Sequence, residues 1–147
     1  MILDRQIRPY IIYYEESIAN ALSRIVDNRG AMICAVDNHN TLHGIFTNGD
    51  FLRWVVNQSQ VDLNQPLRTI LNRDYIFAYE DDAPDVLQAH LEKVNFIPVV
   101  DRSHRLVAMA RHRDKIIHIG NVTITENSPT FVIAEIGINH NGSLERA

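Results

Sequence analysis

The feature that most constrains the fold of this chain is an internal repeat with a spacing of 64 residues. At this spacing Asp37 corresponds to Asp101, and Asp50 corresponds to Asp114. In each copy, a β-rich run and an amphipathic helical pattern precede two short apolar runs joined by a polar turn. One such copy is too small to bury both faces of a sheet. We therefore predict two copies packed sheet against sheet around one core, with their strand–helix junctions facing a common cleft.

The first copy follows a short arm at residues 1–10, in which Pro9 disfavours helical structure at Arg8. Its predicted elements are a strand at residues 10–14, a helix that begins after Ser17 and ends near Gly30, strands at residues 31–36 and 42–46, and a helix from Thr47 to about Gln58. Ser17 is the predicted N-cap, because its hydroxyl can accept from an amide of the first helical turn. The predicted order is strand, helix, strand, strand, helix.

The second copy repeats this order after a polar link at residues 59–66. Its predicted elements are a helical turn at residues 67–71, a strand at 75–79, a helix capped by Asp81 or Asp82 with Leu91 on its apolar side, and strands at 95–100 and 106–110. Residues 111–114 then take the place of residues 47–50. Farther on, apolar residues on both sides of Gly120 and Asn121 predict a β-hairpin.

The junction at Thr47 is the main candidate site. Thr47 is the predicted N-cap of a helix and Asp50 its third helical residue, which brings a hydroxyl, a carboxylate and open backbone amides together. Helix N-termini bind phosphate, and a carboxylate accepts from sugar hydroxyls, so the junction suits a nucleotide. The alternative is a capping box, which stabilises a helix by roughly 0.5–2 kcal/mol without any ligand. The partial repeat of the junction at Asp114 favours a ligand.

The composition argues against several classes of function. Hydrophobic residues make up 46% of the 147 residues and charged residues 22%, which suffices for a packed core. The formal net charge is −4 and the chain has no cluster of lysine or arginine, so we expect no nucleic-acid partner. No apolar run reaches the roughly 18–20 residues of a membrane span. The single cysteine, Cys34, fits neither a disulfide nor a zinc pattern, and we expect a cytoplasmic protein without a metal site.

Residues from about 8 to 114 resemble a tandem pair of cystathionine β-synthase (CBS) domains, known as a Bateman module. The resemblance rests on residues 44–51 and 67–74, on residues 95–101, and on Arg113 and Asp114. It implies an α+β fold of two βαββα units, the first with the N-terminal arm at residues 1–62 and the second at 63–114. It also implies binding of an adenine or related nucleotide, here an AMP, ATP or CMP-type ligand, without a covalently bound cofactor.

The resemblance also implies roles for individual residues. Thr47 maps onto a phosphate contact, and Asp50 and Asp114 map onto ribose contacts. The other residues assigned to nucleotide binding are Gly49, Tyr75, Ile76, Ile97, Pro98 and Arg111. The second copy departs from the family pattern at Ala108, where glycine is usual, and at Arg111, where threonine or serine is usual. Arg111 could pair with a phosphate, block the second site or form an ion pair, and the sequence leaves these alternatives open.

Residues 115–147 resemble a different family. Residues 134–142 resemble the opening strand of sialic acid (N-acetylneuraminate) synthases, (β/α)₈ enzymes that condense phosphoenolpyruvate with an N-acetylated amino sugar. The resemblance places Glu135, Asn139 and His140 at or near the substrate site of a full enzyme. One strand cannot close a barrel, so we expect a fragment with no catalytic residue of its own. A divalent metal is expected only in the full parent enzyme.

Three hypotheses about function follow. In the first, the chain is a regulatory nucleotide-binding module fused to a sialic-acid-type synthase. In the second, it is a ligand-free dimerisation or tethering module of the same synthase, joined to a second copy through apolar helix faces around Trp54 and Leu91. In the third, it is a catalytic fragment, for which we expect no turnover. A homodimer is expected under the first hypothesis as well.

Overall fold

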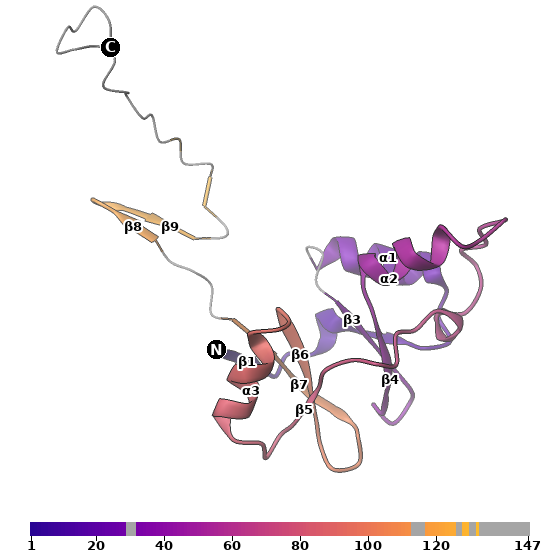
Figure 1. Ribbon diagram of the computed structural model, residues 1–147, viewed down its shortest axis with the longest axis horizontal. Coiled ribbons are helices and arrows are strands. Elements are labelled where there is room, and N and C mark those ends of the chain that lie inside the picture. The colour runs from indigo at the N-terminus through magenta and orange to yellow at the C-terminus, as the bar shows by residue number, and fades with distance from the viewer. Residues whose placement is uncertain (29–31, 113–116, 126–127, 130–131, 133–147) are drawn as a thin grey trace, which may run out of the picture. The chain divides into compact units, whose positions relative to one another are not determined.

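The computed structural model describes residues 1–28, 32–112, 117–125, 128, 129 and 132. The chain divides into two compact units, Met1–Arg113 and Asp114–Ala147. The first unit holds all three helices of the described residues and two sheets, and it is a mixed α+β structure (Figure 1).

The elements of the first unit follow the repeat. The helices are α1 (Ile18–Asp27), α2 (Asn48–Val55) and α3 (Pro84–Leu91), with short 3₁₀ helices at Arg8–Tyr10 and Leu67–Thr69. The strands are β1 (Ile2–Asp4), β2 (Ile11–Tyr13), β3 (Ile33–Val36), β4 (Leu42–Phe46), β5 (Ala78–Tyr79), β6 (Phe96–Val100) and β7 (Leu106–Arg111). Ser17 caps α1 as predicted, because its hydroxyl accepts from the amide of Asn20 at 3.2 Å.

The two sheets share one pairing scheme. In the first sheet β2 runs parallel to β3, and β3 runs antiparallel to β4. In the second sheet β5 runs parallel to β6, and β6 runs antiparallel to β7. The register shifts once in each sheet, between Ala35 and Val36 and between Val99 and Val100. These shifts lie 64 positions apart in the sequence, which confirms the predicted repeat.

Three apolar clusters hold the first unit together. One lies between α1 and the first sheet and includes Ile18 and Ile33. Another lies between α3 and the second sheet and includes Leu91 and Ile97. The middle cluster draws its buried side chains from both sheets, namely Met32, Cys34, Val36, Leu42, Val100, Leu106 and Met109. Successive residues of a strand point to opposite faces, so each sheet contributes to two clusters. The predicted core between two sheets is confirmed.

Two matching turns join the copies. Asp37 and Asp101 each use one carboxylate oxygen to accept from two amides of their own turn, at 2.8–2.9 Å. Asn40 and His104 adopt left-handed backbone conformations in these turns, with φ of 65° and 61°. The amide of Leu42 donates to the carbonyl of His104 at 3.0 Å, and the amide of Leu106 donates to the carbonyl of Asn40 at 2.9 Å. The backbone itself therefore links the two halves.

These turns predict a loss of stability in acid. Burial alone would raise the pKa of Asp37, but hydrogen bonds from His43 and from turn amides lower it by more. Hydrogen bonds from the backbone and side chain of Arg105 lower the pKa of Asp101. A carboxyl group whose folded pKa lies below its unfolded value stabilises the fold above the unfolded pKa, near 4, and loses that contribution as the pH falls further. We expect the urea unfolding free energy to fall below about pH 4.

The measurement is a set of urea titrations between pH 7 and pH 3. The double variant Asp37→Asn, Asp101→Asn should be less stable at pH 7 and should show a shallower decline below pH 4. Glu92→Gln, which changes an exposed carboxylate beyond α3, is the matched control and should keep the wild-type decline. An unchanged decline in the double variant would contradict the role assigned to the two turns.

The N-terminal arm differs from its prediction in two respects. β1 pairs antiparallel with β7, so Ile2 lies opposite Arg111. The arm thereby extends the sheet of the second copy. Residues 8–10 form a 3₁₀ helix although Pro9 was expected to oppose helical structure. Pro9 sits in the first turn of that helix, where its missing amide and fixed φ are compatible with a helical start.

Three further predictions were wrong in detail. Neither Asp81 nor Asp82 caps α3, because the N-cap is Ala83 and the carboxylate of Asp82 instead accepts from the amide of Tyr79 at 2.8 Å. α2 ends at Val55, before Gln58, because the amides of Asn57 and Gln58 donate to carbonyls three residues earlier and not four. Leu91 is only 1% exposed and packs in the core, so it forms no outer apolar face.

The second unit contains a β-hairpin among its described residues. β8 (Ile117–Ile119) pairs antiparallel with β9 (Val122–Ile124). Gly120 in the connecting turn has a φ of 56°, a conformation that glycine adopts without strain. The hairpin predicted around Gly120 and Asn121 is confirmed. Within the residues that the structure describes, no helix is long and apolar enough to cross a membrane.

Candidate functional site

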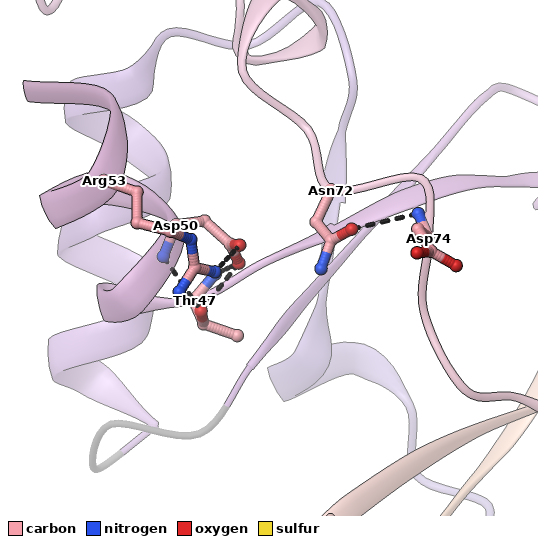
Figure 2. A network of polar contacts seen from close by, with 5 residues as sticks. All are labelled: Thr47, Asp50, Arg53, Asn72 and Asp74. Atoms are coloured by element: carbon pink, nitrogen blue, oxygen red, sulfur yellow. Dashed lines mark hydrogen bonds and ion pairs between the residues drawn. The ribbon is translucent and has the colours of Figure 1, made fainter. Parts of the chain in front are cut away.

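The first turn of α2 is locked by a capping box. The hydroxyl of Thr47 accepts from the amide of Asp50 at 3.2 Å, and the Asp50 carboxylate accepts from the amide of Thr47 at 2.8 Å. The Thr47 hydroxyl also donates to the same carboxylate oxygen at 2.6 Å. The predicted N-cap and the predicted third helical position are both confirmed. Helix capping, the alternative explanation of this motif, therefore operates in the folded chain (Figure 2).

Arg53 occupies the other oxygen of the same carboxylate. Its guanidinium donates to Asp50 at 2.6 Å, one helical turn along α2 (Figure 2). The Asp50 side chain is 7% exposed, whereas the Arg53 side chain is 71% exposed. Asp50 is the one buried charged residue among the described residues. The Arg53 guanidinium is already solvated and can leave this pair when another donor, such as a ligand hydroxyl, takes its place on the buried carboxylate.

Two amides at the start of α2 remain outside the capping box. The first amides of a helix have no acceptor within the helix, and the box satisfies those of Thr47 and Asp50 only. The amides of Asn48 and Gly49 occupy the first two helical positions. A side chain at Gly49 would lie 3.4 Å from the Arg53 guanidinium, so that guanidinium extends over the helix start. The junction thus offers two amide donors and the Asp50 carboxylate, and the exposed guanidinium of Arg53 covers them.

Two hollows flank this junction. One has a volume of about 530 Å³ and is lined by Asp50, Arg53, Trp54, Ile70, Leu71, Asn72 and Asp74. The other has a volume of about 470 Å³ and is lined by Met32, Ile45, Thr47, Asn72, Asp74, Tyr75, Ile76, Val94, Asn95 and Phe96. Asn72 and Asp74 line both, so the hollows adjoin along one segment of chain. Each is large enough for a small molecule of nucleoside size.

The segment from Ile70 to Ile76 forms the shared wall, and β4 holds it in place. Asn72 and Ile45 exchange both backbone hydrogen bonds, each at 2.9 Å. The segment can approach β4 because Gly44 has no side chain there. A Cβ at Gly44 would lie 2.8 Å from the carbonyl oxygen of Asn72. Figure 2 shows Asn72 and Asp74 on this separate segment beside the start of α2.

The aromatic residue of the wall, Tyr75, is held in place by contacts with the turn of the second copy that contains His104. The Tyr75 hydroxyl lies 3.1 Å from Nε2 of His104, and the ring of Phe77 packs edge-on against the same imidazole. Burial, with a smaller contribution from the charge of Cys34, raises the pKa of Tyr75 to about 12. Tyr75 therefore remains protonated and uncharged at physiological pH. It offers an apolar ring surface toward the hollow.

The residues predicted for nucleotide binding separate into three groups. Asp50 lines the first hollow, and Thr47, Tyr75 and Ile76 line the second, whereas Gly49 lines neither. Ile97 and Pro98 are buried within β6, and they line neither hollow. Asp114 lies outside the described residues, as do Glu135, Asn139 and His140.

Arg111 does not begin a helix. It is the last residue of β7 and pairs with both Ile2 and Phe96. In the repeat, the last residue of β4, Phe46, corresponds to Ala110 of β7. β7 continues for one residue more, to Arg111, where it pairs with β1. Arg111 also makes polar interactions with its surroundings. The second junction is therefore built differently from the first up to this residue.

Sequence reasoning missed four residues of the site, namely Arg53, Trp54, Asn72 and Asp74. Trp54 was assigned to an apolar helix face that could join two chains, and Arg53 was given no role. Asn72 and Asp74 were assigned to a break after the helical turn that opens the second copy. The available signal for Arg53 was its spacing of three from Asp50, which places two side chains on one helix face. Within the described residues, no group of three or more acidic, histidine or cysteine side chains could hold a metal ion.

A comparison with known families finds a match, which covers the first copy. Residues 5–57 match the model of the CBS domain. The matched segment contains the capping box at Thr47 and Asp50, and it ends just beyond α2. The comparison with curated proteins finds no match.

Comparison with solved structures extends the likeness to both copies. The CBS domain pair of protein MJ0100, in complex with 5′-methylthioadenosine and S-adenosyl-L-methionine, is 25% identical and has a TM-score of 0.59. The match covers 74% of this chain and 87% of that one. Staphylococcus aureus OpuCA is 24% identical with a TM-score of 0.56, and the match covers 70% of this chain and 84% of that one.

A third structure gives the same architecture. The CBS domain pair/ACT domain protein TM0892 from Thermotoga maritima is 16% identical with a TM-score of 0.57, and the match covers 69% of this chain and 79% of that one. The first unit therefore has the fold of a CBS domain pair, and the α+β Bateman-type architecture predicted from the sequence is confirmed.

Proposed function

We propose that this chain is a cytoplasmic regulatory module that binds an adenine nucleoside or nucleotide at the start of α2. The observation that carries the proposal is the Asp50 carboxylate, which is held at a helix N-terminus between two hollows of nucleoside size. A relative with the same fold and 25% identity was solved with two adenosine compounds bound. Fold likeness and local chemistry support the same class of ligand.

The contacts of the ligand follow from the donors and acceptors of the site. Ribose hydroxyls can donate, and they would replace Arg53 at the carboxylate oxygen of Asp50 that the capping box does not use. The base would lie against the apolar wall that Tyr75 and Ile76 provide. The amides of Asn48 and Gly49 would donate to a remaining acceptor group of the ligand. AMP, ATP and CMP-type compounds, which also contain a ribose and a base, are further candidates.

A binding module regulates only if its ligand distinguishes two states of the protein. The shared wall is suited to this, because it continues directly into β5 of the second copy. A ligand that orders residues 70–76 would reach the second sheet through the contact between Tyr75 and His104. Regulation of an attached catalytic domain is the resulting hypothesis.

A thermal-shift screen tests the proposal. The protein should be heated with adenosine, 5′-methylthioadenosine, S-adenosylmethionine, AMP, ATP and CMP, each at concentrations up to several millimolar. A ligand present at about 100 times its Kd stabilises the folded state by roughly 2.7 kcal/mol, which corresponds to a rise in Tm of more than about 5 °C. Mass spectrometry of the purified protein would detect a carried ligand. If no adenosine compound raises the Tm, the proposal is wrong.

We further propose that the parent protein is a sialic-acid-type synthase. The support is the motif at residues 134–142 with Glu135, Asn139 and His140, which lies outside the described residues. The 147-residue chain should show no turnover with phosphoenolpyruvate, an N-acetylated amino sugar and manganese. A chain that continues through a complete barrel should show turnover, and nucleotide should change its rate. Absence of condensation by such a chain would refute this part.

A second candidate function is dimerisation without a ligand. The exposed apolar residues Leu52 and Val56 lie one turn apart at the end of α2, and they are 59% and 77% exposed. They replace the faces predicted around Trp54 and Leu91, which pack against the protein's own core. Under this candidate, Leu52→Glu would shift the sedimentation coefficient from dimer to monomer while nucleotides remain without effect.

A further inference from the structure

We propose that Asp74 selects the ligand by charge, so that the site prefers uncharged or cationic adenine nucleosides to nucleoside phosphates. The inference rests on the proposed function, because it assumes that an adenine compound binds beside α2. It goes beyond that function by naming which class of adenine compound is taken. Asp74 lines both hollows and therefore lies beside the ligand whichever hollow holds the 5′ group.

The charged residues that line the two hollows are few. They are Asp50, Arg53 and Asp74, and the second hollow has Asp74 as its one charged lining residue. Asp50 and Arg53 pair at 2.6 Å, and their opposite charges still sum to zero in the site when a ribose displaces the guanidinium. The lining of the two hollows therefore has a net charge of about −1, which belongs to Asp74. A site built for phosphate normally carries surplus arginine or lysine, which these hollows lack.

Asp74 is available to act on a ligand. Its amide donates to the side-chain oxygen of Asn72 at 2.9 Å, which orients the backbone at this point. Its carboxylate has no hydrogen bond or ion pair with any other part of the chain that the structure describes. Asp74 is exposed, and charges interact over a Debye length of about 8 Å at physiological ionic strength. A 5′ group in either hollow lies within the reach of this charge.

The hydroxyl of Thr47, which the family resemblance assigns to a phosphate, is already engaged. The single hydroxyl hydrogen of Thr47 is directed to Asp50 at 2.6 Å, and the hydroxyl oxygen accepts from the Asp50 amide. Thr47 therefore has no hydrogen left for a phosphate unless the capping box opens. A thioether or sulfonium group at the 5′ position needs no such donor. It would also avoid the repulsion between a phosphate dianion and Asp74.

Isothermal titration calorimetry with four probes tests the inference. The probes are 5′-methylthioadenosine, S-adenosylmethionine, AMP and ATP, each at 50 and 300 mM salt. We expect AMP to bind at least tenfold more weakly than 5′-methylthioadenosine, and ATP more weakly still. Asp74→Asn should strengthen AMP binding about three- to tenfold and should weaken S-adenosylmethionine binding. High salt should reduce both effects, because exposed charges are screened.

Arg73→Gln is the matched control. Arg73 is exposed and adjacent in sequence, but it lines neither hollow. Its removal should change the ratio of the AMP and 5′-methylthioadenosine affinities by less than twofold. If AMP or ATP binds more tightly than 5′-methylthioadenosine, or if Asp74→Asn leaves the ratio unchanged, the charge selection is refuted while the proposed function stands. If no probe binds at all, the proposed function itself fails.

Discussion

Gly44→Ala should destabilise the first unit by about 1–3 kcal/mol and lower its Tm by roughly 5–15 °C. An added Cβ would lie 2.8 Å from the backbone oxygen of Asn72 and 3.1 Å from Cβ of Leu71. Neither atom is the end of a flexible side chain, so β4 and the shared wall must separate. The reciprocal hydrogen bonds between Ile45 and Asn72 would then weaken. Thermal and urea unfolding measure the effect.

The same variant should also lose ligand affinity, because Asn72 and Asp74 line both hollows and move with the wall. Gly49→Ala is the matched control. A Cβ there meets the guanidinium of Arg53 at 3.4 Å, and this flexible group can shift at little cost. Its stability should therefore change by less than about 1 kcal/mol in either direction. Equal destabilisation by the two variants would contradict the close approach at Gly44.

Asp50→Ala should weaken nucleoside binding at least tenfold, which is the largest effect on binding that we expect from one residue. A hydrogen bond to a charged group contributes about 1.5–3 kcal/mol, and each 1.4 kcal/mol is a tenfold change in affinity. The variant also loses one half of the capping box, at a cost of about 1 kcal/mol in stability. Calorimetry measures the binding, and urea unfolding measures the stability.

Thr47→Ala separates the two roles of this motif. It removes the hydroxyl that caps α2 and should cost a similar amount of stability, but it leaves the Asp50 carboxylate in place for a ribose. We expect its affinity for 5′-methylthioadenosine to fall much less than that of Asp50→Ala. If both variants lose stability and affinity in equal measure, Asp50 acts through helix capping alone, and the ribose contact is refuted.

The features that the sequence predicted correctly are those that depend on local periodicity. The repeat, the order of the strands and helices, the N-caps at Ser17 and Thr47 and the hairpin at Gly120 all follow from residue types at fixed short spacings. The buried strand β3 follows from an unbroken apolar run, since both of its faces are covered. Errors of detail occurred at element ends, where a hydrogen bond such as that of Asp82 to Tyr79 competes with capping.

Tertiary structure alone decided how the walls of the candidate site are assembled. No periodic pattern reveals that the segment around Asn72 lies against β4, because that approach depends on a missing side chain at Gly44 and on packing between distant parts of the chain. The pairing of β1 with β7, which extends the strand through Arg111, is equally non-local. Capping and strand burial are set by neighbouring residues, whereas contacts across the fold are set by which surfaces pack together. The sequence therefore determined the fold and the helix cap, and packing determined what lies opposite that cap.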